Sequence, residues 1–184
     1  MKPALIIIDI QNDYFPGGKM ELEGSSEASL QAAKLLEAFR AKGLPLVHVQ
    51  HISNRPGASF FLPDSEGVNI HANVAPRSGE TVVQKNFPNS FRGTPLLEYL
   101  RGLGADHLVI AGMMTHMCVD ATTRAAFDLG FSCSLAHDAC ATRAVVFGEQ
   151  RVPAAQVHAA FLAALNGLYA KVQSAAAVAA EIAP

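Results

Sequence analysis

The sequence has few cysteines, no long apolar run and no cluster of basic residues. Its 3 cysteines are an odd number without metal-type spacing, which favours free thiols in a reducing cytoplasm over disulfides or a zinc site. The chain has 14 basic and 16 acidic residues and a net charge of −2, so its composition does not predict the basic surface that a nucleic-acid partner would need. No apolar run approaches the roughly 18 residues of a membrane span, and the first one, which ends at Asp9, is too short for a signal peptide. We therefore expect a cytoplasmic protein with neither nucleic-acid nor membrane partners.

The chain does contain enough apolar residues for a sizeable core, 50% of its 184 residues. A chain of this length usually forms one domain, which predicts a single domain over residues 1–184. No internal repeat or low-complexity linker divides it.

The apolar pattern alternates along the chain between the periods typical of strands and of helices. Strands are expected at residues 5–8, 44–50, 81–84, 107–111, 131–136 and 168–172. Helices are expected at residues 25–42, with Ser25 or Ser26 as the N-cap, and at 95–103, 116–129, 153–166 and 174–182. This alternation predicts an α/β fold, a parallel sheet of about six strands with helices on both faces.

The 27 residues from Ser53 to Gly79 break the alternation. They contain several Gly, Pro, Asn and Ser residues and the adjacent pair Phe60 and Phe61. A loop of this length inside a compact domain is usually a lid, a binding loop or an oligomer contact. The sequence leaves these three interpretations open.

Three reactive side chains follow the expected strands at their carboxyl ends, where open α/β sheets bind ligands. Asp9 follows the first strand, Lys85 the third, and Cys118 lies in the first turn of the helix after the fourth. Taken singly, Asp9 is often a turn former, Lys85 a solvated side chain and Cys118 a small buried hydrophobe. Because all three would meet at one edge of the sheet, together they predict a catalytic site.

The predicted neighbourhood favours Cys118 as a nucleophile. A helix N-terminus and the ammonium of Lys85 would both lower the pKa of its thiol. Unpaired N–H groups of the first helical turn could hold a developing oxyanion. Asp9 would take the thiol proton and later give it to a leaving amine, while Lys85 would keep that carboxylate ionised and oriented.

Three ordered motifs carry a resemblance to a known family. Residues 9–14, Asp-Ile-Gln-Asn-Asp-Tyr, resemble the Asp-x-Gln-Asn-Asp-Phe motif of the isochorismatase-like cysteine hydrolases. Lys85 with Ser90 and Phe91 is similar to their Lys-x-x-x-x-Ser-x-Phe segment. Residues 112–119, Gly-Met-Met-Thr-His-Met-Cys-Val, resemble their Gly-x-x-Thr-x-x-Cys-Val signature.

The resemblance implies a Rossmann-like three-layer α-β-α sandwich and an Asp9–Lys85–Cys118 triad. It also implies a cis peptide between Met113 and Met114, and an oxyanion hole formed by the backbone N–H groups of Met114 and Cys118. Members of the family include nicotinamidases, carbamoylsarcosine amidases and isochorismatases, and they usually form oligomers. For this chain it therefore implies a homo-oligomer, a dimer or tetramer, that hydrolyses a small amide-type substrate.

Several residues are candidates to contact that substrate. Tyr14 stands where the family motif has Phe, and His51 offers a hydrogen bond. Four further candidates are Phe60, Phe61, Phe91 and Met117, although packing in the core is an equally good interpretation for the aromatic residues and Met.

A metal centre and other cofactors are not expected. The nicotinamidases of the family carry Asp-x-His after their second strand, whereas Ile52 and Asn54 occupy those places here. His48, His51 and His71 remain, but without the carboxylate the ligand set is incomplete. Cys133 is expected in a strand and Cys140 in a loop, both without a catalytic role, and His137 and Asp138 could support the site.

The most favoured function is thus a hydrolase that cleaves a non-peptide C–N bond, in an amide, lactam or ureido group, through a cysteine thioester. One alternative is an isochorismatase-type vinyl-ether hydrolase, which needs an acid but no nucleophile. A second is a non-catalytic binding protein on the same fold. A nitrilase-type enzyme would use Glu in place of Asp9 and usually a longer chain.

Overall fold

A computed structural model of the chain describes residues 1–182. Its central element is a six-stranded parallel sheet in the order β3-β2-β1-β4-β5-β8. The strands are β1 (Pro3–Ile8), β2 (Leu46–His51), β3 (Thr81–Lys85), β4 (His107–Met113), β5 (Ser132–Ala141) and β8 (Lys171–Gln173). The chain order reverses between β1 and β4, and a ligand crevice is expected at the carboxyl ends of these two strands.

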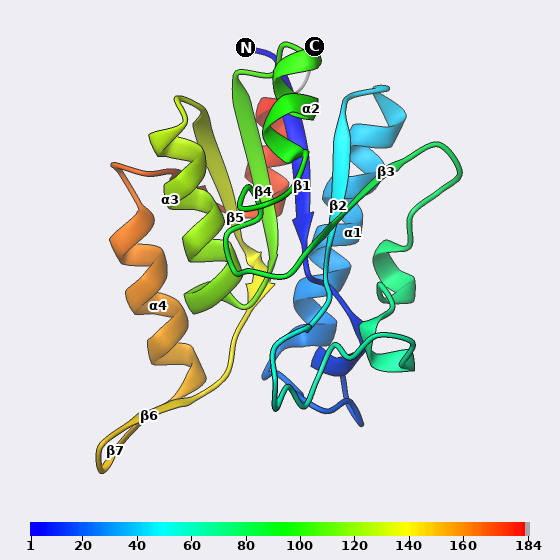
Figure 1. Cartoon of the computed structure of the whole chain (residues 1–184). Coiled ribbons are helices and arrows are strands. Elements are labelled where there is room, and N and C mark those ends of the chain that lie inside the picture. The colour runs from blue at the N-terminus through cyan, green and yellow to red at the C-terminus, as the bar shows by residue number, and fades with distance from the viewer. Residues whose placement is uncertain (183–184) are drawn as a thin grey trace.

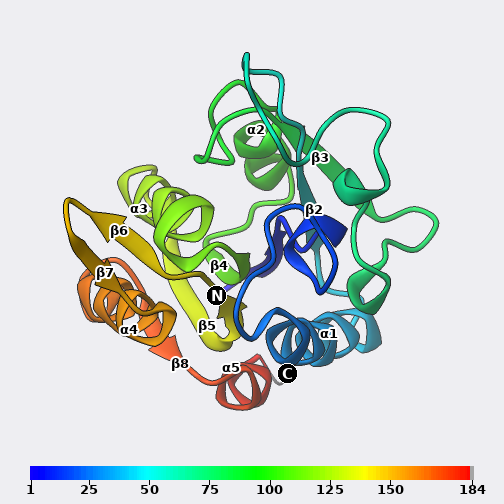
Figure 2. The ribbon, with the colours of Figure 1, turned by 90° about the horizontal axis from the view of Figure 1, so that it is seen from below.

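Helices cover both faces of the sheet (Figures 1 and 2). One face carries α1 (Ser25–Ala41) and α5 (Ala175–Glu181), and the other carries α2 (Leu96–Gly102), α3 (Asp120–Asp128) and α4 (Ala154–Leu165). In β1, Leu5 and Ile7 pack beneath α1, whereas Ile6 and Ile8 pack beneath the other layer. Because both faces are buried, the strand is apolar at every position. The predicted three-layer α/β sandwich is confirmed.

Helix α1 begins differently from the prediction. Its N-cap is Gly24, in the left-handed conformation with φ 75°, and no side chain caps the first turn. Ser25, expected as a possible cap, lies inside the helix and is buried. Glycine enters a left-handed conformation without steric cost, so the turn before the helix replaces a serine cap.

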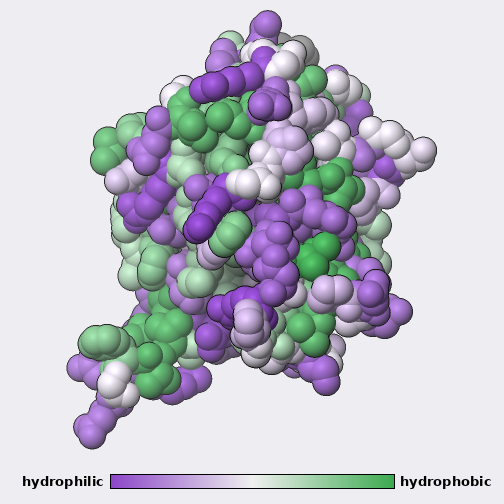
Figure 3. Space-filling model, in the orientation of Figure 1, coloured by the Kyte–Doolittle hydropathy of each residue, from purple (hydrophilic) through white to green (hydrophobic). Residues whose placement is uncertain are grey.

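The region after the fifth strand also differs. β5 extends to Ala141, past a register shift between Ile110 and Gly112 of β4, so Cys140 lies buried in a strand and not in a loop. A hairpin of β6 (Val145–Phe147) and β7 (Gln150–Val152) then projects from the body of the molecule (Figures 1 and 3). Strands of three residues are too short to show a period in sequence, which is why this hairpin was not predicted.

The long loop of residues 53–79 is ordered by the segment that follows β1. It contains two 3-10 turns, η2 (Glu66–Val68) and η3 (Ala72–Val74). Gln11 and Ile70 form an isolated bridge, and the N–H of Asn12 donates to the carbonyl of Asn69 at 3.0 Å. The loop therefore forms one wall beside the carboxyl end of β1.

No helix within residues 1–182 has both the length and the apolarity needed to cross a membrane.

Candidate active site

Asp9, Lys85 and Cys118 come together at the carboxyl edge of the sheet. Asp9 directly follows β1, Lys85 is the last residue of β3, and Cys118 lies in η4 (Thr115–Val119), a π-helical turn after β4. The Nζ atom of Lys85 is 2.7 Å from Asp9 Oδ2 and 3.3 Å from Cys118 Sγ. The three residues are at most 5% exposed. The sequence thus placed an acid, an ammonium and a thiol correctly at one edge.

Lys85 stays charged although it is buried. Burial lowers the pKa of its ammonium, but Asp9 and Cys118 more than compensate, and the resulting pKa is above the ordinary value. His51 provides a third contact, with its Nδ1 3.0 Å from Lys85 Nζ. Burial and the Lys85 charge lower the pKa of His51 to about 4, so near neutral pH the ring is neutral and its Nδ1 accepts a hydrogen bond from the lysine ammonium.

Only one of the two carboxylate oxygens of Asp9 has a hydrogen-bond partner within residues 1–182. Its backbone takes a left-handed φ of 50°, and its N–H donates to the carbonyl of Val49 at 3.0 Å. Oδ2 accepts from Lys85, whereas Oδ1 is buried without a partner among residues 1–182. The Cys118 thiol lies within 4.8 Å of a carboxylate oxygen. A carboxylate oxygen with a free lone pair beside a thiol is suited to act as a base.

The pKa of Cys118 corrects one prediction. The sequence suggested that the helix N-terminus and Lys85 would lower it. Burial and the negative charge of Asp9 instead raise the pKa of the thiol far above its ordinary value, and Lys85 offsets this only in part. Cys118 therefore rests as a thiol, and a reaction of its sulfur would need a base that takes the proton.

The segment before Cys118 approaches β1 closely. A Cβ on Gly112, which has φ 138°, would lie 2.0 Å from the carbonyl oxygen of Ile8, so only glycine fits. The Met113–Met114 peptide is cis, as the family resemblance implied. The Met114 carbonyl accepts from the N–H groups of Met117 and Val119, at 3.0 and 3.3 Å. The Met114 N–H itself has no hydrogen-bond acceptor within residues 1–182.

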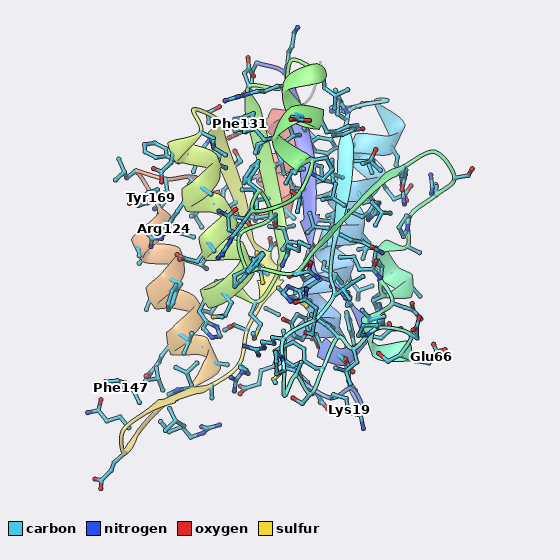
Figure 4. The ribbon with its side chains drawn as sticks, viewed as in Figure 1. Lys19, Glu66, Arg124, Phe131, Phe147 and Tyr169 are labelled. Carbon is cyan, nitrogen blue, oxygen red and sulfur yellow. The ribbon has the colours of Figure 1, made fainter. Side chains whose placement is uncertain are left out.

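A cavity of about 250 Å³ opens onto Cys118. Its lining residues are Tyr14, His51, Ser53, Asn54, Arg55, Phe60, Phe61, Asn86, Phe87, Pro88, Met114, Met117 and Cys118. Five of the six candidate substrate contacts are thus in its wall. The sixth, Phe91, is not in the wall. Its ring stacks on that of Phe131, with centroids 6.2 Å apart, in the hydrophobic core on the face of the sheet that α2, α3 and α4 cover. Figure 4 shows Phe131 well away from the loop around the cavity.

Gln11 and Asp13 hold the wall of the cavity in place, and the sequence reasoning did not single them out. The side-chain N–H₂ of Gln11 donates to the carbonyls of His51, at 2.9 Å, and Val68, at 2.7 Å. Asp13 Oδ2 accepts from the N–H of Phe61 at 2.6 Å. Their position in the motif of residues 9–14 was the available signal. Within this motif, Asp9 lies near the thiol of Cys118, whereas Gln11 and Asp13 hold the cavity wall.

His137 and Asp138 were expected as possible supports of the site. Asp138 instead accepts from the N–H of Ala175 at the start of α5, at 2.7 Å. The turn that carries Cys118 is held by other residues: Thr115 Oγ1 lies 2.9 Å from His158 Nδ1, and His116 Nδ1 contacts Thr142 Oγ1 at 2.5 Å.

One group of potential metal ligands exists within residues 1–182, formed by Asp9, His51 and Cys118. The Lys85 ammonium contacts all three and occupies the position that a cation would need. His71 lies elsewhere, with its ring stacked 3.6 Å from that of Phe15. These residues therefore fit a lysine-centred cluster better than a metal.

The family of the chain follows from comparison with known proteins. A model described as the isochorismatase domain matches residues 3–177. The isochorismatase family protein YddQ of Bacillus subtilis (strain 168) is 51% identical over 174 residues, which are 95% of this chain and 97% of that protein. The chain belongs to the isochorismatase family.

Two further members of the isochorismatase family are informative. A solved structure from Oleispira antarctica, named as an isochorismatase hydrolase, has a TM-score of 0.94 and 53% identity over 97% of this chain and 96% of its own. Maleamate amidohydrolase of Pseudomonas putida is 33% identical over 144 residues, 71% of this chain and 68% of that enzyme. The family membership and these names support a hydrolase that acts on small molecules.

Proposed function

We propose that this protein is a cysteine hydrolase that cleaves a non-peptide C–N bond of a small molecule through a thioester. The observation that carries the proposal is the double contact of the Lys85 ammonium, with Asp9 at 2.7 Å and with Cys118 at 3.3 Å, next to a 250 Å³ cavity that Cys118 lines. An acid–base group and a nucleophile then share one charged neighbour. A binding protein would gain nothing from burying this cluster at the end of a cavity.

The first half-reaction forms the thioester. Asp9 takes the proton of Cys118, whose Sγ attacks the carbonyl carbon of the substrate. The carbonyl oxygen becomes an oxyanion, which the N–H groups of Met114 and Cys118 would stabilise. The C–N bond breaks as Asp9 gives its proton to the leaving nitrogen, and the acyl group stays on Sγ. Lys85 holds the Asp9 carboxylate in position and faces the sulfur as negative charge develops on it.

The second half-reaction repeats these roles with water. Asp9 takes a proton from water as the oxygen attacks the thioester carbon. The C–S bond then breaks, Cys118 recovers its proton from Asp9, and the carboxylic acid product leaves. No group outside Asp9, Lys85, Cys118 and the two N–H donors is needed to balance the protons.

The name of the maleamate amidohydrolase relative supports an amide substrate. The alternative within the same family, hydrolysis of a vinyl ether, needs an acid but no nucleophile. The placement of Cys118 beside Asp9 and Lys85 therefore favours acyl transfer.

The test is ammonia release from a panel of small primary amides and ureido compounds, with ring opening of lactams followed by mass spectrometry, for the wild-type protein and Cys118→Ala. We expect release by the wild type, none by Cys118→Ala, and an acyl adduct on Cys118 by intact mass spectrometry. Cys133→Ala is the matched control and should keep wild-type turnover. Equal turnover by Cys118→Ala would exclude the thioester. Cleavage of a vinyl ether by both proteins would favour the alternative.

We further propose that the protein acts as a homo-oligomer in the cytoplasm. The hairpin of β6 and β7 exposes Val146 and Phe147, which are 69% and 86% exposed. Next to it, α4 has no charged side chain, so two copies of this helix can meet across a twofold axis without opposing like charges. The 3 free cysteines support a reducing compartment. Light scattering should give a dimer or tetramer for the wild type and a smaller species for Phe147→Asp.

A further inference from the structure

The charge of the cavity lining differs from that of the whole chain. The chain has a net charge of −2, yet no carboxylate lines the cavity, and its one formally charged lining residue is Arg55. Ser53, Asn54 and Asn86 add polar groups to the lining. Asn86 donates its side-chain N–H₂ to the carbonyl of Ile52 at 2.8 Å, which fixes that part of the wall. The wall thus offers positive charge and hydrogen-bond donors, with no acidic residue to neutralise them.

Arg55 is held at the cavity by a tight turn. The N–H of Ala58 donates to the Arg55 carbonyl at 3.3 Å, and Gly57 has φ 77°. Proline followed by glycine at the centre of a turn fits the backbone of a type II turn, with Arg55 as its first residue. Arg55 forms no ion pair within residues 1–182. Its guanidinium is therefore available to a ligand.

Two neighbours strengthen this positive character. Arg92 lies over the ring of Phe87, a lining residue, with its guanidinium carbon 3.8 Å from the ring centroid. His51 accepts from Lys85 through Nδ1, so its other nitrogen, Nε2, carries the proton and is a donor. The positive charge of Arg55 also reaches His51, where it is one of the influences, after burial and Lys85, that lower the pKa.

The cavity also limits the size of the ligand. Its 250 Å³ correspond to about eight water molecules at about 30 Å³ each. Tyr14, Phe60 and Phe61 fill part of the lining with aromatic rings, and the Tyr14 and Phe61 rings lie 4.6 Å apart. The space suits a short molecule with one polar end at Arg55 and the scissile carbonyl at Cys118.

We propose that the substrate is a small amide or ureide that carries a carboxylate, and that Arg55 selects for this carboxylate. The proposal rests on the proposed function for the reaction at Cys118. The guanidinium binds both oxygens of a carboxylate through parallel N–H groups, and it attracts an anionic substrate to the cavity mouth. Uncharged amides of the same size lack this contact and bind more weakly.

The first experiment measures ammonia release from matched pairs of substrates. Succinamate and succinamide, or glutaramate and glutaramide, differ only in a carboxylate against a carboxamide. We expect kcat/KM to be at least about tenfold higher for the monoamides, a difference typical of one charge-assisted contact. Arg55→Gln should abolish this preference, mainly through a higher KM for the monoamides. Arg101→Gln, an exposed arginine on α2 at the far end of the sheet (Figure 1), is the control.

The second experiment needs no turnover. Iodoacetate and iodoacetamide alkylate a thiol by the same displacement of iodide, and only the first carries a carboxylate. The ratio of their rates at Cys118, read by peptide mapping, should fall at least about fivefold in Arg55→Gln and in high salt, since a carboxylate contact of about 1 kcal/mol is lost. The ratios at Cys133 and Cys140, and that at Cys118 in Arg101→Gln, should not change.

The two experiments separate the possible failures. Rapid hydrolysis of diamides and monoamides alike, with no effect of Arg55→Gln, overturns the carboxylate proposal and leaves the amidase standing. A rate ratio that depends on Arg55, with no ammonia from any amide, supports the anion site and counts against the amidase. An alkylation ratio that is unchanged in Arg55→Gln overturns the proposal whatever the amides show.

Discussion

Two clusters of charged side chains in this protein are built from similar parts but differ in completeness. In the first, Glu80 accepts from Arg40 through both oxygens, each at 2.7 Å, and also from His48 at 3.0 Å and the N–H of Arg77 at 2.8 Å. In the second, Asp9 accepts one bond from Lys85, and its other oxygen has no partner within residues 1–182. The first cluster lies at the start of β3 and the second at its end.

The difference fits a structural role for the first cluster and the proposed catalytic role for the second. The four bonds to Glu80, led by those from Arg40, lower its pKa to about 2 and leave no oxygen free for a proton. This cluster fixes β3 and the end of the long loop against α1. Asp9 instead keeps one oxygen without a partner within residues 1–182, and a carboxylate oxygen of Asp9 lies within 4.8 Å of the thiol of Cys118, which lines the cavity. A saturated carboxylate therefore stabilises structure, whereas an unsaturated one is available for chemistry.

The comparison is tested most strongly by removing the two carboxylates in turn. Asp9→Asn should lower kcat by roughly 10²–10⁴-fold, because an amide cannot take or return the proton. Glu80→Gln should keep kcat within about twofold. Steady-state kinetics on the substrate found in the screen, with circular dichroism to verify folding, decides the matter. Comparable activity losses in the two variants would mean that the clusters do not differ in role.

The second prediction concerns the partner of Asp9. Lys85→Met removes the ammonium and leaves a buried carboxylate unpaired, which should lower the free energy of unfolding by about 3–5 kcal/mol. The double variant Asp9→Asn, Lys85→Met should lose less than the sum of the single changes, since neither charge remains. Urea denaturation of the three variants measures this coupling. Strict additivity would show that the 2.7 Å contact contributes little.

The third prediction concerns Glu80. Because its pKa in the folded protein is about 2, below the ordinary 4.5, its contribution to stability is complete above about pH 4.5 and is lost as pH falls toward 2. A shift of this size corresponds to roughly 3 kcal/mol. Glu80→Gln should therefore unfold more easily by about 2–3 kcal/mol at pH 7, and the gap to the wild type should narrow between pH 4.5 and 2. A constant gap in denaturant titrations at both pH values would contradict this.

The smallest expected effect is that of chelation, which should be none. Lys85 already contacts Asp9, His51 and Cys118, so a metal would have to displace a buried ammonium. We expect the purified protein to contain no stoichiometric transition metal by mass spectrometry, and turnover and melting temperature to be unchanged after dialysis against EDTA. Activity that disappears with the chelator and returns with zinc, manganese or iron would show that the second cluster binds a metal after all.

Local patterns in the sequence were sufficient for most of the fold. Apolar runs such as residues 5–8 and the repeating leucines of α2 report burial directly, so the expected strands and helices, and a parallel sheet covered on both faces, followed from them. The β6–β7 hairpin and the end of β5 at Ala141 did not follow, because short strands have no period and the shift at Ile110 depends on the neighbouring strand. The cap of α1 was misassigned because Gly24 and Ser25 are both acceptable there by composition alone.

The candidate site divides in the same way. The sequence by itself determined which side chains end the strands, and therefore that Asp9, Lys85 and Cys118 share one edge of the sheet. Only the tertiary structure decided how buried they are, and burial is what raises the pKa of Cys118 where the sequence suggested a lower one. It also decided that Phe91 packs on Phe131 and that Arg55 reaches the cavity. The residues that end each strand can be identified from the sequence, whereas desolvation and cavity shape arise only when distant segments pack together.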